Sequence, residues 1–133
     1  MCGIAAIYST DRDQLEPIGR MVELLAHRGP DDQGIEVLQE EGLALGMRRL
    51  SIIDLAGGHQ PMWDESRRYG VIFNGEIYNF LELRAELLSL GHTFNTQRSD
   101  TEVILNGFAT MFTFNEIWNI CHWAWSVQSV HRN

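Results

Sequence analysis

A chain of 133 residues with 44% hydrophobic and 21% charged residues is typical of one soluble globular domain with a buried core. Its formal net charge of −8 argues against a nucleic-acid-binding surface, and the lack of an 18-residue apolar run argues against a membrane span. Neither a signal peptide nor a disulfide framework is expected, because the start carries no basic segment and Cys2 and Cys121 are the only cysteines, so we expect a cytoplasmic protein.

Hydrophobic periodicity and turn signals predict a strand, a helix and a hairpin in the first part of the chain. An apolar run is typical of a buried strand, and apolar residues spaced by three and four are typical of one helix face. Gly29-Pro30 is a strong break and marks a loop. The expected elements are a strand at 3–8, a helix that Pro17 opens with Ile18, Met21, Val22 and Leu25 on its apolar face, a loop at 27–34, and a hairpin with strands at 35–38 and 43–47.

The next part of the chain predicts a strand followed by two helices, which indicates an α+β layered domain. Asn79 with Glu82 three residues later resembles a capping box, and Gly91 is a typical residue after a helix end. The expected elements are a strand at 69–73 that stops at the turn-forming Asn74-Gly75, a helix after Asn79 with Phe80, Leu83, Leu87 and Leu90 on its apolar face, and a third helix that starts with the capping pattern at 99–102.

The last 25 residues differ in composition from the rest of the chain. The whole net charge of −8 arises before Ala109, whereas Trp118, Trp123 and Trp125 all follow it. No helical or strand period appears in this segment. We therefore expect the domain pattern to cover residues 1–108, with 109–133 as a divergent apolar tail of different origin or from a disrupted reading frame.

Cys2 allows two interpretations. Cysteine is often a small buried hydrophobe, and Cys2 directly precedes the expected first strand. Alternatively, removal of Met1 would place the α-amino group on Cys2, where the pKa of such a group is roughly 7.7–8.0. A base in that range suits proton transfer, so the amine could activate the thiol of the same residue as an N-terminal nucleophile.

Amide hydrolysis by a cysteine also needs an oxyanion site and groups that bind the ends of the substrate. Asn74 and Gly75 offer a side-chain amide and a backbone N–H, which are common oxyanion donors. Candidates for the two ends of a glutamine-like substrate are Arg28, Arg48 and Arg49 for the carboxylate, and Glu76 and Asp100 for the ammonium group. Each of these residues also has an ordinary structural interpretation, as a turn, a strand-end charge or a helix cap.

Neither a metal site nor a phosphate loop is indicated. His27, His59 and His92 are separated by loops and strands and lack the spacing of zinc ligands. AGGH at 56–59 is too short for a phosphate loop and no helical pattern follows it, and the chain contains no lysine.

Five segments in the same order resemble the glutaminase domain of glutamine-hydrolysing asparagine synthetase. They are MCGI at the start, HRGPDDQG at 27–34, RRLSIIDLAGGHQPM at 48–62, VIFNGEIYNF at 71–80 and RSDTEVIL at 98–105. That domain is a class II glutamine amidotransferase, a group within the N-terminal nucleophile hydrolases. The resemblance covers about residues 1–108.

The resemblance implies a role for each candidate residue. Cys2 matches the nucleophile whose α-amine acts as the base. Asn74 and Gly75 match the oxyanion hole, through a side-chain amide and a backbone N–H. The residues that match positions binding L-glutamine are Arg49 for its carboxylate, and Glu76 and Asp100 for its amino end.

The resemblance also implies a fold and a missing part. The family's domain is a four-layer αββα sandwich, which would be incomplete here because the family's domain continues for many more residues. The family then adds an ATP-dependent synthetase domain that receives the ammonia. ATP and magnesium are therefore implied only for that absent domain, no cofactor is expected in this chain, and a synthetase domain or partner chain is the expected partner.

Three functions stay open from the sequence. The first is glutamine hydrolysis to glutamate and ammonia, as the amide-donor half of an asparagine synthetase-like amidotransferase. The second is a non-catalytic truncated remnant, or a module that depends on a partner chain. The third is a class II amidotransferase with a different acceptor, because the acceptor is chosen outside this domain.

Overall fold

The structure of the chain is a computed structural model that describes residues 2–51, 57–109 and 128–131. It divides into two compact units: unit 1 comprises Met1–Ile52 and His59–Pro61, and unit 2 comprises Ile53–Gly58 and Met62–Asn133. In the described residues, each unit contains a three-stranded antiparallel sheet and at least one helix. This confirms the α+β class expected from the sequence.

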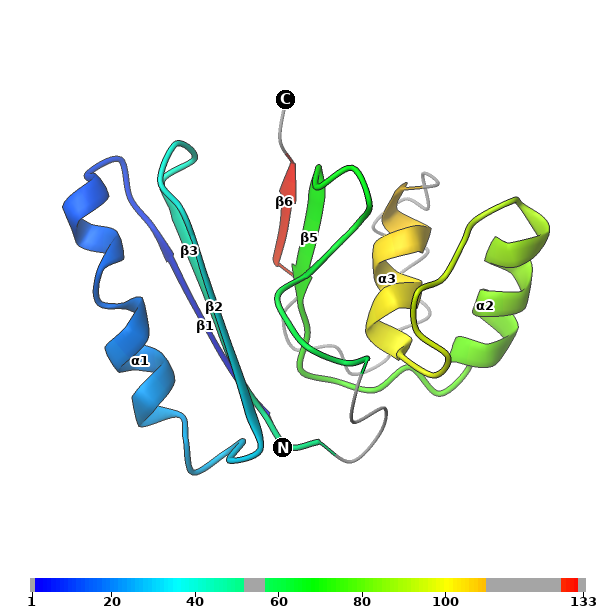
Figure 1. Cartoon of the computed structure of the whole chain (residues 1–133), viewed down its shortest axis with the longest axis horizontal. Coiled ribbons are helices and arrows are strands. Elements are labelled where there is room, and N and C mark those ends of the chain that lie inside the picture. The colour runs from blue at the N-terminus through cyan, green and yellow to red at the C-terminus, as the bar shows by residue number, and fades with distance from the viewer. Residues whose placement is uncertain (1, 52–56, 110–127, 132–133) are drawn as a thin grey trace. The chain divides into compact units, whose positions relative to one another are not determined.

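Unit 1 combines a sheet with helix α1, which covers one of its faces (Figure 1). The central strand β3 pairs with β1 on one side and with β2 on the other. The elements in chain order are β1 Gly3–Tyr8, the 3-10 helix η1 Arg12–Leu15, α1 Ile18–Leu24, β2 Asp32–Leu38 and β3 Leu43–Arg49. The predicted first strand, first helix and hairpin are therefore confirmed, and both hairpin strands are longer than predicted.

Close packing of α1 on the sheet depends on small strand residues. The buried cluster between them consists of Ala5, Leu15, Ile18 and Ala44, with Ile7 and Leu25 packed against it. A Cβ at Gly46 would lie 2.3 Å from Cγ2 of Val22, so only glycine allows this approach. Met21, which the sequence places on the buried face, is partly exposed.

Strand β2 begins earlier than the sequence predicts. The predicted loop extends to residue 34, whereas β2 starts at Asp32. The pairing of β2 with β3 extends to Asp32, which lies opposite Arg49, and a Cβ at Gly34 within this strand would lie 1.7 Å from the carbonyl oxygen of Gln60. Gly34 is therefore a strand residue that accommodates a neighbouring backbone, which the local sequence does not reveal.

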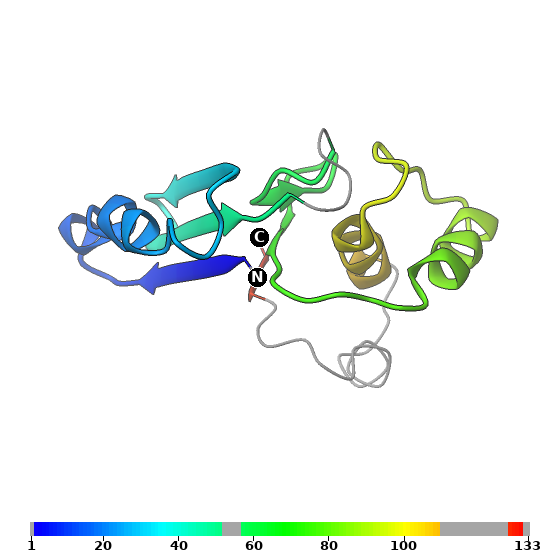
Figure 2. The same ribbon diagram turned by 90° about the horizontal axis from the view of Figure 1, so that it is seen from below.

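Unit 2 contains a second sheet with β5 in its centre, between β4 and β6. Figure 2 shows α3 between this sheet and α2. The elements are β4 Met62–Trp63, β5 Tyr69–Ile72, α2 Phe80–Ser89, α3 Asp100–Ala109 and β6 Gln128–His131. The predicted strand at 69–73 and the two predicted helices are confirmed.

The divergent tail predicted from Ala109 onward is described only in part. Ala109 ends α3, and Gln128–His131 pairs antiparallel with β5 as strand β6. Residues 110–127, including the three tryptophans of the tail, lie outside the described residues. The domain boundary at residue 108 stays a prediction.

The core of unit 2 joins β5 to α3. Val71 and Phe73 project to the same side, because side chains alternate along a strand, and they pack with Ile104 and Leu105 of α3. Ile77 completes the buried cluster, and Met62, Tyr69, Phe80 and Leu83 pack around it. The segment that follows β5 is thereby held against α3.

Helix α2 ends as the sequence predicts. Gly91 has a φ of +93°, which favours glycine. Its N–H donates to the Leu88 carbonyl at 3.1 Å, and the N–H of His92 donates to the Leu87 carbonyl at 3.0 Å. These two hydrogen bonds form a Schellman C-cap. Leu90, expected on the apolar face, is 58% exposed because it lies beyond the last helical turn.

The start of α2 differs from the prediction. Asn79 makes no side-chain hydrogen bond to the helix, so the predicted capping box is wrong. Its backbone has φ −96° and ψ 24°, outside the extended region from which a capping side chain reaches the first turn. The Asn79 carbonyl instead accepts hydrogen bonds from the N–H groups of Glu82 and Leu83.

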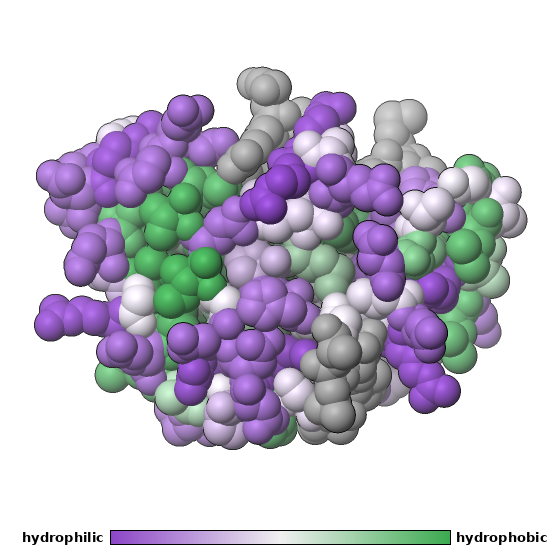
Figure 3. Space-filling model, viewed as in Figure 1, coloured by the Kyte–Doolittle hydropathy of each residue, from purple (hydrophilic) through white to green (hydrophobic). Residues whose placement is uncertain are grey.

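Apolar side chains also reach the surface of both units (Figure 3). The large ones are Tyr8, Met21, Leu24, Ile35 and Val37 in unit 1, and Tyr78, Leu81, Leu88 and Leu90 in unit 2. Among the described helices, none is both long enough and apolar enough to cross a membrane.

A buried carboxylate fixes the loop before α3. Glu102 is 4% exposed and accepts hydrogen bonds from the N–H groups of Asn95 at 2.6 Å and Thr96 at 2.8 Å, and from the Thr96 hydroxyl at 2.5 Å. These charge-assisted hydrogen bonds offset the cost of burying the carboxylate. Glu102 therefore ties the first turn of α3 to the chain that precedes it.

We expect Glu102→Gln to lower the free energy of unfolding by about 1.5–3 kcal/mol, because the amide loses the charge and one acceptor oxygen. Urea unfolding followed by circular dichroism measures this change. Glu82→Gln, on the exposed first turn of α2, is the matched control and should change stability by less than about 0.5 kcal/mol. Equal effects of the two substitutions would contradict the assignment.

Candidate active site

The pairing of β1 with β3 places Cys2 next to the end of β3. Gly3 lies opposite Arg48, so Cys2 is adjacent to the residues that follow β3. Its Sγ lies 4.0 Å from the Leu50 carbonyl oxygen, within the range of a sulfur hydrogen bond. Cys2 is half-buried, which is compatible with a reactive thiol and differs from the full burial expected of a core cysteine.

Arg28 contacts the backbone of Cys2. Its Nε donates a hydrogen bond of 3.0 Å to the Cys2 carbonyl oxygen. The sequence suggests Arg28 only as a candidate for a substrate carboxylate, and it gives no signal for a contact between residues so far apart in the chain. The structure therefore adds Arg28 to the surroundings of the candidate nucleophile.

Arg49 is the last residue of β3, and its side chain is buried. Gly46 faces α1, and side chains alternate along a strand, so Arg49 projects from the opposite face of the sheet. The N–H of Asp31 donates to the Arg49 carbonyl at 3.1 Å, and the N–H of Ser51 donates to Asp31 Oδ2 at 2.8 Å. Asp31 is a residue of this site region that the sequence analysis does not identify.

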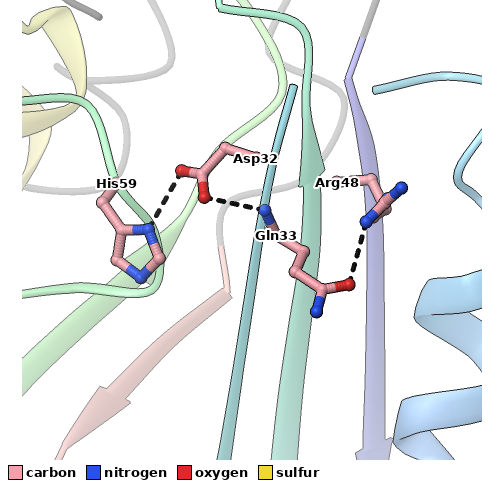
Figure 4. A network of polar contacts seen from close by, with 4 residues as sticks. All are labelled: Asp32, Gln33, Arg48 and His59. Atoms are coloured by element: carbon pink, nitrogen blue, oxygen red, sulfur yellow. Dashed lines mark hydrogen bonds and ion pairs between the residues drawn. The ribbon is translucent and has the colours of Figure 1, made fainter. Parts of the chain in front are cut away.

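A polar network connects β3, β2 and the segment at 59–61 (Figure 4). Asp32 accepts hydrogen bonds from Nδ1 of His59 at 3.0 Å and from the N–H of Gln33 at 2.8 Å. Oε1 of Gln33 accepts from Nη1 of Arg48 at 2.8 Å. His59 therefore anchors its segment to β2, and Arg48 is engaged by Gln33.

In unit 2, Asn74 and Gly75 follow β5, with Asn74 half-buried and Gly75 exposed. The turn preference of this dipeptide correctly marks the end of the strand. Gly75 does not have a positive φ, however. A Cβ at Gly75 would lie 2.6 Å from Cζ of Phe73, so the buried Phe73 ring would have to shift to accommodate any other residue.

A hydrogen bond ties Asp100 to the segment after Gly75. Asp100 is the first residue of α3, and its Oδ2 accepts from the N–H of Ile77 at 3.1 Å. Burial is the main cause that raises the pKa of Asp100 above its ordinary value; backbone hydrogen bonds oppose it, and the charge of Glu76 adds to it. Glu76 and Asp100 therefore lie close enough to interact.

The predicted site residues fall into two groups. Unit 1 holds Cys2 and Arg49, and unit 2 holds Asn74, Gly75, Glu76 and Asp100. Within the part of the chain that the structure describes, no group of three His, Cys, Asp or Glu side chains could hold a metal ion.

Comparison with known proteins identifies the class of this α+β domain. The family model of the glutamine amidotransferase domain matches residues 1–124. The chain is 47% identical over 110 residues to asparagine synthetase (glutamine-hydrolysing) 1 of Bacillus subtilis. The aligned region covers 79% of this chain and 17% of that protein. It is also 45% identical over 107 residues to asparagine synthetase (glutamine-hydrolysing) 2 of Oryza sativa subsp. japonica. This aligned region covers 78% of this chain and 17% of that protein.

The chain belongs to the glutamine amidotransferase domain family. Within that family, it is homologous to the glutaminase domains of asparagine synthetases, which confirms the resemblance found in the sequence. It spans 17–18% of the length of these relatives. The assignment of individual residues to the site stays a prediction.

The raised pKa of Asp100 predicts a pH-dependent contribution to stability. At pH values between the ordinary pKa of 3.8 and the raised pKa of folded Asp100, the folded state binds more protons than the unfolded state. The free energy of unfolding therefore falls as the pH rises through this window. Asp100→Asn keeps an acceptor for the N–H of Ile77 and removes this fall. The stability of the variant relative to the wild type should grow from pH 3.8 upward and then level off, as urea unfolding at successive pH values can measure.

Asp64→Asn serves as a control, because we expect it to change the free energy of unfolding in the opposite direction to Asp100→Asn. Burial alone would raise the pKa of Asp64, but hydrogen bonds from Ser66 and from the N–H of Tyr69 outweigh it and hold the pKa below 3.8. The stability that Asp64 contributes is present above pH 3.8 and is lost as the pH falls below that value. Asp64→Asn should therefore be less stable than the wild type near neutral pH. The same sign for both variants would contradict this account.

Proposed function

We propose that this chain hydrolyses L-glutamine to L-glutamate and ammonia, as the amide-donor half of an asparagine synthetase-type amidotransferase. The observation that carries the proposal is the family match over residues 1–124, which contains every candidate site residue. The names of the relatives, which specify glutamine hydrolysis, support the substrate. No observation favours a non-catalytic remnant or a different acceptor.

In the proposed first step, Cys2 attacks the side-chain amide of glutamine. After Met1 is removed, the α-amine of Cys2 takes the thiol proton as the sulfur forms a bond to the amide carbon. The Asn74 side-chain amide and the N–H of Gly75 donate hydrogen bonds to the oxyanion. The C–N bond then breaks, the proton passes from the amine to the departing ammonia, and a γ-glutamyl thioester remains on Cys2.

Water completes the proposed reaction. The α-amine of Cys2 takes a proton from a water molecule as its oxygen attacks the thioester carbon. The C–S bond breaks, the thiolate recovers the proton, and glutamate leaves. These steps need no metal or cofactor, so we propose that ATP and magnesium belong to a synthetase step outside this chain.

Substrate binding is assigned to three charged side chains. Arg49 would bind the α-carboxylate of glutamine, and its buried position strengthens such an ion pair. Glu76 and Asp100 would bind the ammonium group. The hydrogen bond from Ile77 fixes the Asp100 carboxylate, whose remaining lone pairs can accept from a substrate ammonium.

We further propose that the domain has the four-layer αββα sandwich of N-terminal nucleophile hydrolases. In unit 1, α1 covers one face of the sheet, while Leu45 and Met47 lie on the other face of β3. In unit 2, α3 packs on Val71 and Phe73, while Ile72 projects to the other side. In each unit, buried apolar residues of the sheet therefore also lie on the face opposite the helix, as a layered fold with both sheet faces covered requires.

The assignment of the nucleophile predicts labelling at one position. A chloroketone analogue of glutamine should add once to the chain, at Cys2, with chloride leaving as the C–S bond forms, and glutamine should slow the reaction. Intact-mass measurement should also show that Met1 has been lost. Cys121→Ser is the control and should label like the wild type, whereas Cys2→Ser should not label. Saturable labelling at Cys121 with Met1 retained would overturn the assignment.

The proposed division of roles predicts different kinetic effects of two substitutions. Asn74→Ala removes an oxyanion donor, so kcat should fall about 10²–10³-fold with little change in KM. Arg49→Ala removes binding of the substrate carboxylate in ground and transition states alike, so KM should rise. Asn79→Ala is the matched control, because its side chain makes no cap hydrogen bond. An ammonia-release assay on the full chain measures all three, and equal effects of the first two would refute the division.

A further inference from the structure

The loop at 28–31 contacts both functional segments of unit 1. At one end, Nε of Arg28 donates to the Cys2 carbonyl oxygen at 3.0 Å. At the other end, the N–H of Asp31 donates to the Arg49 carbonyl at 3.1 Å. A single short loop therefore bridges the candidate nucleophile and the candidate carboxylate-binding arginine.

The middle of this loop packs directly on the backbone of β3. A Cβ at Gly29 would lie 2.4 Å from the carbonyl carbon of Arg48 and 2.4 Å from the nitrogen of Arg49. Any other residue would push the loop away from that peptide bond. Pro30 follows, with a fixed φ, and it also restricts the conformation of the residue before it. The loop is therefore both close to β3 and stiff.

The side chain of Asp31 extends the contact past the end of β3. Its Oδ2 accepts a hydrogen bond of 2.8 Å from the N–H of Ser51, while its own N–H binds the Arg49 carbonyl. Asp31 thus holds the backbone on both sides of residue 50. This arrangement limits how far the backbone of Arg49 can move relative to the loop.

We propose that the loop at 28–31 sets the separation between Cys2 and Arg49, with Arg28 and Asp31 as positioning residues. Arg28 orients the peptide group of Cys2, and with it the thiol and the α-amine. Gly29 and Asp31 fix the backbone of Arg49. The inference rests on the proposed function, because the separation matters only if Arg49 binds the glutamine carboxylate while Cys2 attacks its side-chain amide.

The two ends of the loop should affect different kinetic parameters. The distance from the carboxylate of glutamine to its side-chain amide is limited by the length of the substrate, and a misplacement of about 1 Å at the reacting atoms can cost about 10²-fold in rate. Loss of the Arg28 contact should therefore slow the chemical step. Loss of the Asp31 contacts should weaken binding, because it loosens the backbone of Arg49.

Unit 1 offers matched controls outside the loop. The Arg12 guanidinium also donates to backbone carbonyls, those of Ser9 at 3.2 Å and Glu40 at 2.6 Å. The side chain of Asp11 also accepts from a backbone N–H, that of Asp13, at 3.2 Å. These two residues perform the same structural task without contacting Cys2 or Arg49.

Labelling of Cys2 in the full chain by the chloroketone analogue tests the proposal without requiring turnover. We expect Arg28→Gln and Arg28→Lys to lower the maximal labelling rate roughly tenfold, with the half-saturating concentration unchanged. Asp31→Ala and Asp31→Glu should raise the half-saturating concentration roughly tenfold, with the maximal rate unchanged. Asp31→Asn, which keeps an acceptor for Ser51, should restore the wild-type value, and Arg12→Gln and Asp11→Asn should not differ from the wild type.

Thermal unfolding of each variant separates positioning from stability. If Arg28→Gln or Asp31→Ala does not fold, Arg28→Lys and Asp31→Glu decide the test. Wild-type labelling parameters in these two variants, or equal losses in the Arg12 and Asp11 controls, would overturn the positioning role alone. Absence of saturable labelling at Cys2 in the wild type would overturn the proposed function, and the positioning role with it.

Discussion

The antiparallel pairing of β1 with β3 is the constraint on which the candidate site in unit 1 depends. It runs from Gly3 opposite Arg48 to Tyr8 opposite Leu43, so the start of the first strand lies beside the end of the central strand. Cys2 is thereby brought near Leu50. Because the side-chain period of a strand is two, a shift of one residue would move Arg49 to the face covered by α1. The register thus decides which side chains can take part in chemistry.

The first turn of α3 in unit 2 carries two carboxylates, one with a structural role and one that is a candidate for substrate binding. Glu102 accepts three hydrogen bonds and holds the preceding loop. Asp100, two residues earlier, is bound by the N–H of Ile77, but burial and the charge of Glu76 raise its pKa. The fold therefore disfavours the negative charge on Asp100, and a substrate ammonium group would favour it. This difference fits the ammonium-binding role proposed for Asp100 and Glu76.

Local sequence signals predict the helices and strands of this fold well. They do not reveal the tertiary contacts that determine which residue stands at particular positions. Hydrophobic periodicity identifies the main strands and helices, and Gly91 correctly marks a helix end, because these signals depend on neighbours in the chain. Gly34 and Gly75 are glycines for reasons that periodicity cannot reveal, namely the Gln60 carbonyl and the Phe73 ring. The motifs at 27–34 and 71–80 identify the family and its candidate residues. The contact of Arg28 with Cys2 emerges only when distant segments meet in the folded unit.

Trapping the acyl-enzyme would establish that Cys2 attacks glutamine and carries it as a thioester. The full chain is mixed with glutamine, quenched with acid within the first turnover, digested and analysed by mass spectrometry. We expect a γ-glutamyl group on the peptide that begins with Cys2, formed together with one equivalent of ammonia and absent from Cys2→Ser. Ammonia release without an adduct on Cys2, or an adduct on Cys121 that persists in Cys2→Ser, would show that Cys2 is not the nucleophile.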